Sequence, residues 1–168
     1  PSGGNIAIPN DATNQGRALL LLQSAGLIKL NDGGSPLSTP ADIDASASKV
    51  KVTPVDAAQT VTSLPSVDGA VINNNFANDA GIDPKAALFA DSAKSDNAAP
   101  YINVFAARPE DKNNETLLKA IKIWHDPEVA KAVLKDSNNS AVLVKDRSQA
   151  ELQHITDGLQ ADIKKARK

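Results

Sequence analysis

Short β-branched runs alternate with helical segments and turn-forming residues early in the chain, and this alternation constrains the fold most strongly. Residues 5–9 form a short apolar run that ends at proline, as is typical of a strand. Further runs predict strands at 49–53, 69–72 and 102–107, with a helix at 56–64 among the connections. The strand at 49–53 alternates valine with lysine, which indicates a sheet edge. Strands connected by helices pair in parallel, so we expect an α/β fold with an open, mostly parallel sheet.

The helix that follows the first strand contains four consecutive leucines. Asp11 and Asn14 are candidate N-cap residues, residues 15–25 form the predicted helix, and Gly26 ends it. The leucines at 19–22 point around more than half of the helix circumference. Such a helix needs apolar neighbours on more than one side. We therefore expect it to lie between the sheet and other elements.

The density of charged side chains rises near Arg108. Residues 1–108 carry 17 charged side chains, none of them Glu, whereas the 60 residues of 109–168 carry 21. We place a domain boundary between these two stretches. The second stretch predicts three amphipathic helices, at 115–124, 127–135 and 148–165, and one short strand at 141–144.

One face of the helix at 115–124 is apolar. Leu117, Leu118, Ile121 and Trp124 keep the spacing of side chains that share a helix face. We expect this face to be buried, either against the first stretch or against material that the chain does not include.

Composition argues against several classes of function. The formal net charge of −2 and the aromatic content of 3% are unlike those of a nucleic-acid-binding surface, so no nucleic-acid partner is expected. The chain has no Cys, which excludes a disulfide framework, a zinc–thiolate site and a cysteine nucleophile. His125 and His154 lie on charge-dense helical segments, away from the polar loops, and no phosphate-loop or metal-ligand spacing is present. We expect neither an enzyme nor a cofactor or metal site.

Two polar segments follow predicted strands, at the sheet edge where open α/β sheets bind ligands. Arg17 is expected in the first turn of its helix, where the helix N-terminus favours an anion and a guanidinium binds a carboxylate through two N–H groups. Asn73 ends the strand at 69–72 and begins a run of three asparagines, whose amides both donate and accept hydrogen bonds. Two alternatives stay open: Arg17 as a solvated surface residue, and the asparagines as helix caps.

Four segments together resemble the sequence of one known family. The most specific is Ile-Ala-Ile-Pro-Asn-Asp-Ala-Thr-Asn-Gln-Gly-Arg-Ala-Leu at 6–19. The other segments match in the same order, at 70–77, 100–104 and 127–129. These segments are similar to those of the NlpA family, the methionine-binding lipoproteins of ABC uptake systems. The resemblance covers most of the chain and weakens after about residue 139.

The resemblance implies a two-lobed, periplasmic-binding-protein-like (type II) fold that closes on a free amino acid. In that family, an arginine at the position of Arg17 binds the ligand carboxylate and an asparagine at the position of Asn73 holds its polar head. Asn75 and Asn14 are expected as neighbouring ligand-binding residues. The segment 101–104 is expected to be a hinge. The implied partners are methionine or a related amino acid and the permease and ATPase subunits of the importer, and the implied location is extracytoplasmic, as a membrane-anchored lipoprotein.

The resemblance also assigns the two stretches to lobes. Residues 1–108 correspond to the ligand-binding lobe two and 109–168 to the C-terminal part of lobe one. On this basis the chain is expected to be a fragment that binds methionine weakly or not at all by itself, and that can self-associate through exposed lobe-one surface. The rival interpretation is a cell-surface interaction or structural lipoprotein fragment without ligand transport, and an enzyme on the same fold ranks third.

Overall fold

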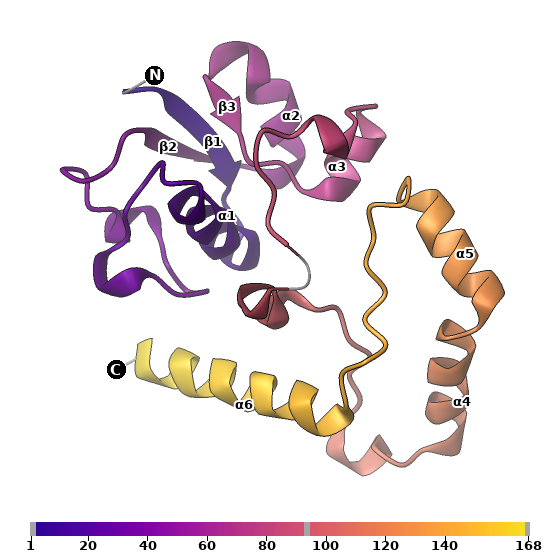
Figure 1. Ribbon diagram of the computed structural model, residues 1–168. Coiled ribbons are helices and arrows are strands. Elements are labelled where there is room, and N and C mark those ends of the chain that lie inside the picture. Colours follow the sequence, from indigo (N-terminus) through magenta and orange to yellow (C-terminus); the bar gives the residue numbers. More distant parts are fainter. Residues whose placement is uncertain (1–2, 93–94, 167–168) are drawn as a thin grey trace. The chain divides into compact units, whose positions relative to one another are not determined.

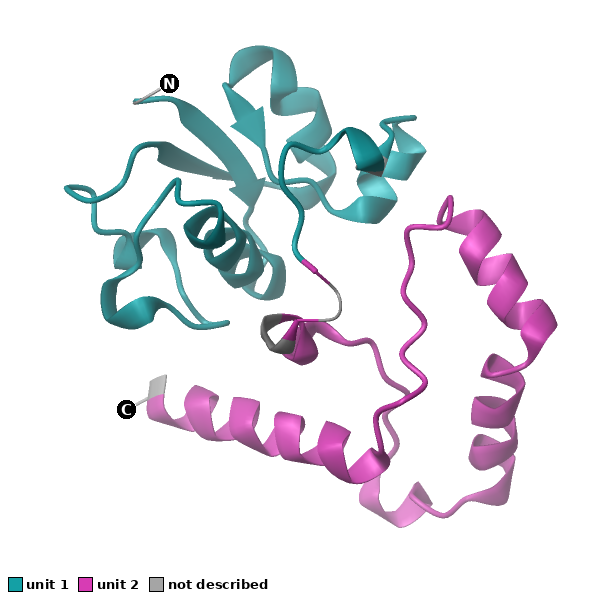
Figure 2. Ribbon diagram, viewed as in Figure 1, with its two compact units in different colours: residues 1–91 teal, residues 92–168 magenta. Residues whose placement is uncertain are grey.

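The computed structural model describes residues 3–92 and 95–166 and contains two compact units. Unit 1 comprises residues 1–91 and unit 2 residues 92–168 (Figure 2). These units are defined by contacts within the chain, so the lobe boundary expected at residue 108 stays a prediction.

Unit 1 is built on a three-stranded parallel sheet with the order β2-β1-β3 (Figure 1). The strands are β1 (Asn5–Pro9), β2 (Lys51–Val55) and β3 (Gly69–Ala70). Ile6 of β1 lies opposite Val52 on one side and Gly69 on the other. The predicted open parallel sheet is therefore confirmed, and β2 is the edge strand that its alternating lysines indicated.

β3 is shorter than the strand predicted at 69–72. Regular pairing ends at Ala70, although the backbone N–H of Val71 still donates to the carbonyl oxygen of Ala7 at 2.8 Å. Both residues of the strand are half-buried, because β3 lies at the edge of the sheet.

The predicted leucine-rich helix is confirmed as α1 (Ala12–Ser24), which lies in front of the strands in Figure 1. Asp11 is its N-cap, so the helix begins three residues earlier than predicted. Leu19 and Leu22 are buried against Ile8 of β1, and the other two leucines pack around this core. Gly26, with a φ of 68°, follows the helix in the left-handed conformation that suits glycine.

The remaining helical segments of unit 1 are short. The helix predicted at 56–64 divides into a 3₁₀ turn, the single α-helical turn α2 (Thr60–Ser63) and a second 3₁₀ turn that contains Pro65. The others are α3 (Asn74–Asp79) and 3₁₀ turns at Asn31–Gly33, Pro40–Asp42 and Pro84–Ala86.

Unit 2 contains the three predicted amphipathic helices. They are α4 (Glu115–Trp124), α5 (Pro127–Asp136) and α6 (Gln149–Ala166), with 3₁₀ helices at Asp96–Tyr101 and Pro109–Asp111. Across 3–92 and 95–166, no helix combines the length and the apolar character that crossing a bilayer requires.

The strands predicted at 102–107 and 141–144 are wrong. Neither segment joins a β-ladder in the described part of the chain. An apolar run becomes a strand only when another strand offers it backbone hydrogen bonds, and every described strand lies in unit 1.

The apolar face of α4 is largely uncovered within the described residues, so its expected burial, against the first stretch or against material that the chain does not include, stays a prediction. Leu117, Leu118 and Trp124 are each at least 40% exposed. Trp124 packs edge-to-face on Phe105, with 5.8 Å between ring centroids, but Phe105 is itself exposed. Self-association through such a surface stays a prediction, which the molar mass from sedimentation equilibrium would test.

We predict that Gly16→Ala destabilises unit 1. Gly16 is buried in α1, and a Cβ there would lie 2.1 Å from the carbonyl oxygen of Pro36. The clash can be relieved only if α1 moves away from the loop that contains Pro36, because both contacting groups are held by backbone. We therefore expect a loss of about 1–3 kcal/mol in the free energy of unfolding. Amide hydrogen exchange in β1 measures this directly, since the single tryptophan lies in unit 2.

The matched control is Gly158→Ala in α6, where a Cβ would have no neighbouring atom within 4 Å. Alanine is a better helix former than glycine by about 1 kcal/mol, so this variant should not destabilise the chain. Equal protection of the β1 amides in the wild type and in Gly16→Ala would contradict the prediction.

Candidate functional site

The candidate site lies at the carboxyl edge of the sheet, between β1 and β3. The chain leaves β1 to form β2 on one side and later returns to form β3 on the other side. Strand order therefore changes direction between β1 and β3, and open α/β sheets bind ligands at such a switch point. The segments that follow these two strands lead into α1 and α3.

Asn14 from α1 and Asn73 from the end of the β3 segment meet at this edge. The Asn73 Nδ2 donates to Asn14 Oδ1 at 2.8 Å, across 59 residues of sequence. The Asn14 Nδ2 in turn donates to both carboxylate oxygens of Asp11, at 3.0 and 3.1 Å. A carboxylate accepts and does not donate, so it fixes which end of the Asn14 amide carries the NH₂ group. The Asn14 oxygen must then face Asn73, which fixes the second amide as well.

This arrangement leaves one buried acceptor without a partner. The Asn73 Oδ1 is buried and accepts no hydrogen bond from any described residue. A buried acceptor in this state costs about 1–3 kcal/mol relative to a satisfied one. The site therefore favours a ligand that brings an N–H or O–H donor to this oxygen.

The alternative role of Asn73 as a helix cap is not what the structure shows. Asn73 holds the N-cap position of α3 with an extended backbone (φ −66°, ψ 143°). Its side chain nevertheless makes no capping hydrogen bond. The amide is directed to Asn14 of the neighbouring helix instead.

Arg17 lies three residues after Asn14 on α1, so the two side chains share a helix face. It is in the second turn rather than the predicted first turn, because α1 begins at Ala12. The helix N-terminus favours an anion only within about the first turn, so its expected contribution to anion binding at this guanidinium does not apply. The Arg17 Nε donates to Asp91 Oδ2 at 2.6 Å, and both side chains are about one-third exposed (36% and 33%).

Asn75 and Asp91 show where sequence reasoning is weakest. Asn75 is an exposed residue of α3, and its expected place in the ligand site stays a prediction. Asp91 was not anticipated, although it contacts the predicted carboxylate-binding arginine. Its segment has no strand or helix pattern, and 74 residues separate it from Arg17, so the sequence carries no signal for the contact.

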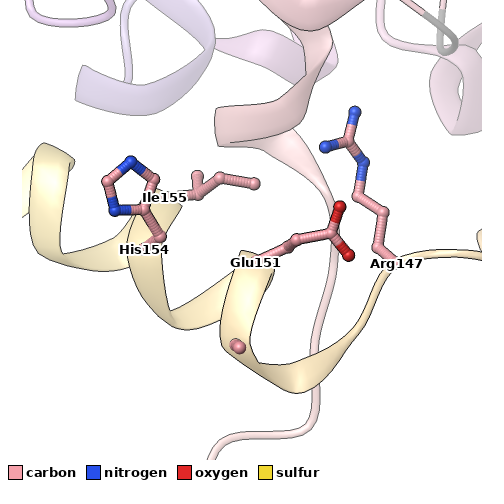
Figure 3. Close-up of a pocket in the computed structure, with 5 residues that line it drawn as sticks. Arg147, Glu151, His154 and Ile155 are labelled. Carbon is pink, nitrogen blue, oxygen red and sulfur yellow. The ribbon is translucent and has the colours of Figure 1, made fainter.

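A separate hollow of about 340 Å³ lies on unit 2, at the start of α6 (Figure 3). It is lined by Arg147, Ala150, Glu151, His154 and Ile155. The backbone N–H and the hydroxyl of Ser148 both donate to Glu151, and these bonds lower the pKa of that carboxyl. Glu151 thus caps its own helix, and the hollow is an exposed surface feature.

His154 belongs to this hollow, whereas His125 caps the C-terminal end of α4. Both histidines are in unit 2, while the candidate ligand residues are in unit 1. Within the described ranges, no group of three or more His, Asp or Glu side chains gathers in a way that could hold a metal ion.

Comparison with known proteins identifies the family. The model of the family described as NlpA lipoprotein matches residues 1–144. The chain belongs to the NlpA lipoprotein family. This NlpA chain is 38% identical over 143 residues to the D-methionine-binding lipoprotein MetQ of Salmonella typhi, covering 83% of this chain and 51% of that protein. The chain therefore spans about half the length of the curated relatives that it matches.

Solved structures agree with this assignment. The substrate-binding protein of a methionine transporter from Streptococcus pneumoniae is 42% identical, with a TM-score of 0.70 over 83% of this chain and 54% of that one. A nutrient-binding protein from Burkholderia cenocepacia, solved bound to methionine, is 38% identical, with a TM-score of 0.74 over 86% of this chain and 60% of that one. The NlpA chain thus has the predicted α/β fold of the periplasmic substrate-binding proteins.

We predict that Asn14 and Asn73 are energetically coupled. In a double-mutant cycle of Asn14→Ala and Asn73→Ala, the free energies of unfolding should depart from additivity by about 0.5–1.5 kcal/mol, the usual contribution of one hydrogen bond. The control is a second cycle that combines Asn14→Ala with Asn31→Ala, because Asn31 lies on a different loop. The effects of these two substitutions should be additive. Additive effects for Asn14 and Asn73 as well would contradict the observed contact.

Proposed function

We propose that the protein is the substrate-binding component of an ABC importer, which binds methionine or a close amino-acid relative and delivers it to the permease. The supporting relatives are named for methionine binding and for methionine transport. A protein of this class breaks no bond. Its work consists of binding a ligand, closing two lobes around it and releasing it to a membrane partner.

The observation that carries the proposal is the Asn14–Asn73 pair with the unpaired acceptor of Asn73. Asn14 shares a face of α1 with Arg17. A free amino acid presents an ammonium group and a carboxylate on adjacent carbon atoms. Asn73 Oδ1 can accept a hydrogen bond from the ammonium group, and the Arg17 guanidinium can bind the carboxylate through two N–H groups. Asn14, whose own amide is fixed by Asp11, holds Asn73 in place for this role.

The other parts of the proposal follow from family membership. The permease and ATPase subunits of the importer are the proposed partners, and the proposed location is extracytoplasmic, with a lipid anchor in the full-length protein. Residues 1–108 would form lobe two and 109–168 part of lobe one. Loss of methionine uptake on deletion of the gene, restored by the intact gene, tests the transport role.

Binding is tested by titration calorimetry with methionine on the natural, full-length protein. Saturable binding of one methionine per protein supports the proposal. A ligand present at a hundred times its Kd also stabilises the folded state by about 2.7 kcal/mol, so methionine should raise the Tm. Absence of both effects would favour the rival function, a surface or structural lipoprotein without transport.

We predict that Arg17→Lys weakens methionine binding by about tenfold to a hundredfold. Lysine keeps the positive charge but loses the planar fork that binds a carboxylate through two hydrogen bonds. Arg108→Lys is the matched control, because Arg108 is an exposed arginine that pairs with its near neighbours in sequence, Glu110 and Asp111. Equal affinity for methionine in the Arg17→Lys and Arg108→Lys variants would contradict the assigned role of Arg17.

A further inference from the structure

Asp91 pairs with Arg17, the residue whose guanidinium is proposed to bind the ligand carboxylate. Asp91 Oδ2 lies 2.6 Å from Arg17 Nε, a charge-assisted hydrogen bond of the kind that a bound amino acid would form. We propose that Asp91 is an internal competitor, which holds Arg17 in the ligand-free protein and must be displaced by the carboxylate of the incoming ligand. This inference rests on the proposed function, because it concerns the same arginine.

The Arg17–Asp91 pair is suited to exchange. Both side chains are about one-third exposed, and ion pairs at such positions are weak because water screens them. Asp91 belongs to residues 87–92, which have no regular secondary structure. The carboxylate can therefore leave Arg17 without breaking a helix or a strand.

Displacement follows from the charges involved. Two carboxylates beside one guanidinium repel each other, so a ligand carboxylate and Asp91 compete for Arg17. A carboxylate ligand binds only those protein molecules in which Asp91 has left Arg17. Its apparent affinity is therefore the intrinsic affinity multiplied by the fraction of molecules in that state. Asp91 would thus lower the affinity of the site for carboxylate ligands, and its effect should be absent for a ligand without a carboxylate.

The test compares Asp91→Asn with the wild type in the natural, full-length protein. Calorimetric titrations use two probes, L-methionine and L-methioninamide, in which a neutral amide replaces the carboxylate. Asp32→Asn is the control for the change in net charge. Asp32 is exposed in unit 1, and its φ of 53° is tolerated by asparagine. Circular dichroism and the Tm establish that each variant is folded.

We expect Asp91→Asn to bind methionine about two- to fivefold more tightly than the wild type, the range for exchange of a weak, partly exposed ion pair. Its affinity for methioninamide should be unchanged, and Asp32→Asn should alter neither affinity. Unchanged or weaker methionine binding in Asp91→Asn would overturn the inference while the proposed function stands. Equal tightening for both probes would overturn it too, because the effect would not depend on the carboxylate. A wild type that binds neither probe would overturn the proposed function itself, and the inference with it.

Discussion

Parallel pairing of β1 with strands on both sides is the constraint on which the rest of unit 1 depends. Because β2 and β3 both run parallel to β1, the segments that leave β1 and β3 must emerge at the same edge of the sheet. At that edge the side chain of Asn73 donates a hydrogen bond to Asn14, which lies 59 residues away in sequence. Burial of Ile8 against Leu19 and Leu22 holds α1 on this sheet and so fixes the position of Asn14 and Arg17.

Sequence patterns predicted the elements whose stabilising contacts are local or repeat at short range. β1, α1 and the helices α4, α5 and α6 were predicted from apolar spacing, proline and capping residues, and all are present. The strands expected at 102–107 and 141–144 are absent, because a strand depends on a distant partner that no local pattern reveals. The amphipathic pattern of α4 likewise predicts the helix but not its neighbours, because burial depends on what packs against the helix.

The candidate site was predictable in its components but not in its connections. Strand ends identified Asn73, and the segment after β1 contained Asn14 and Arg17. The chain of hydrogen bonds from Asp11 through Asn14 to Asn73 depends on the folded register. Likewise, the helix start at Ala12 moved Arg17 out of the first turn, and Asp91 reached it from a segment without a pattern. Positions of polar groups could thus be predicted, whereas their partners required the structure.

A crystal structure of the natural protein with methionine bound tests the central claim most directly. We predict that the ligand ammonium group lies within hydrogen-bond distance of Asn73 Oδ1, with the Asn73–Asn14 bond retained, and that the ligand carboxylate contacts the Arg17 guanidinium. Methionine bound elsewhere, with Asn73 Oδ1 still unpaired and Arg17 still on Asp91, would contradict it.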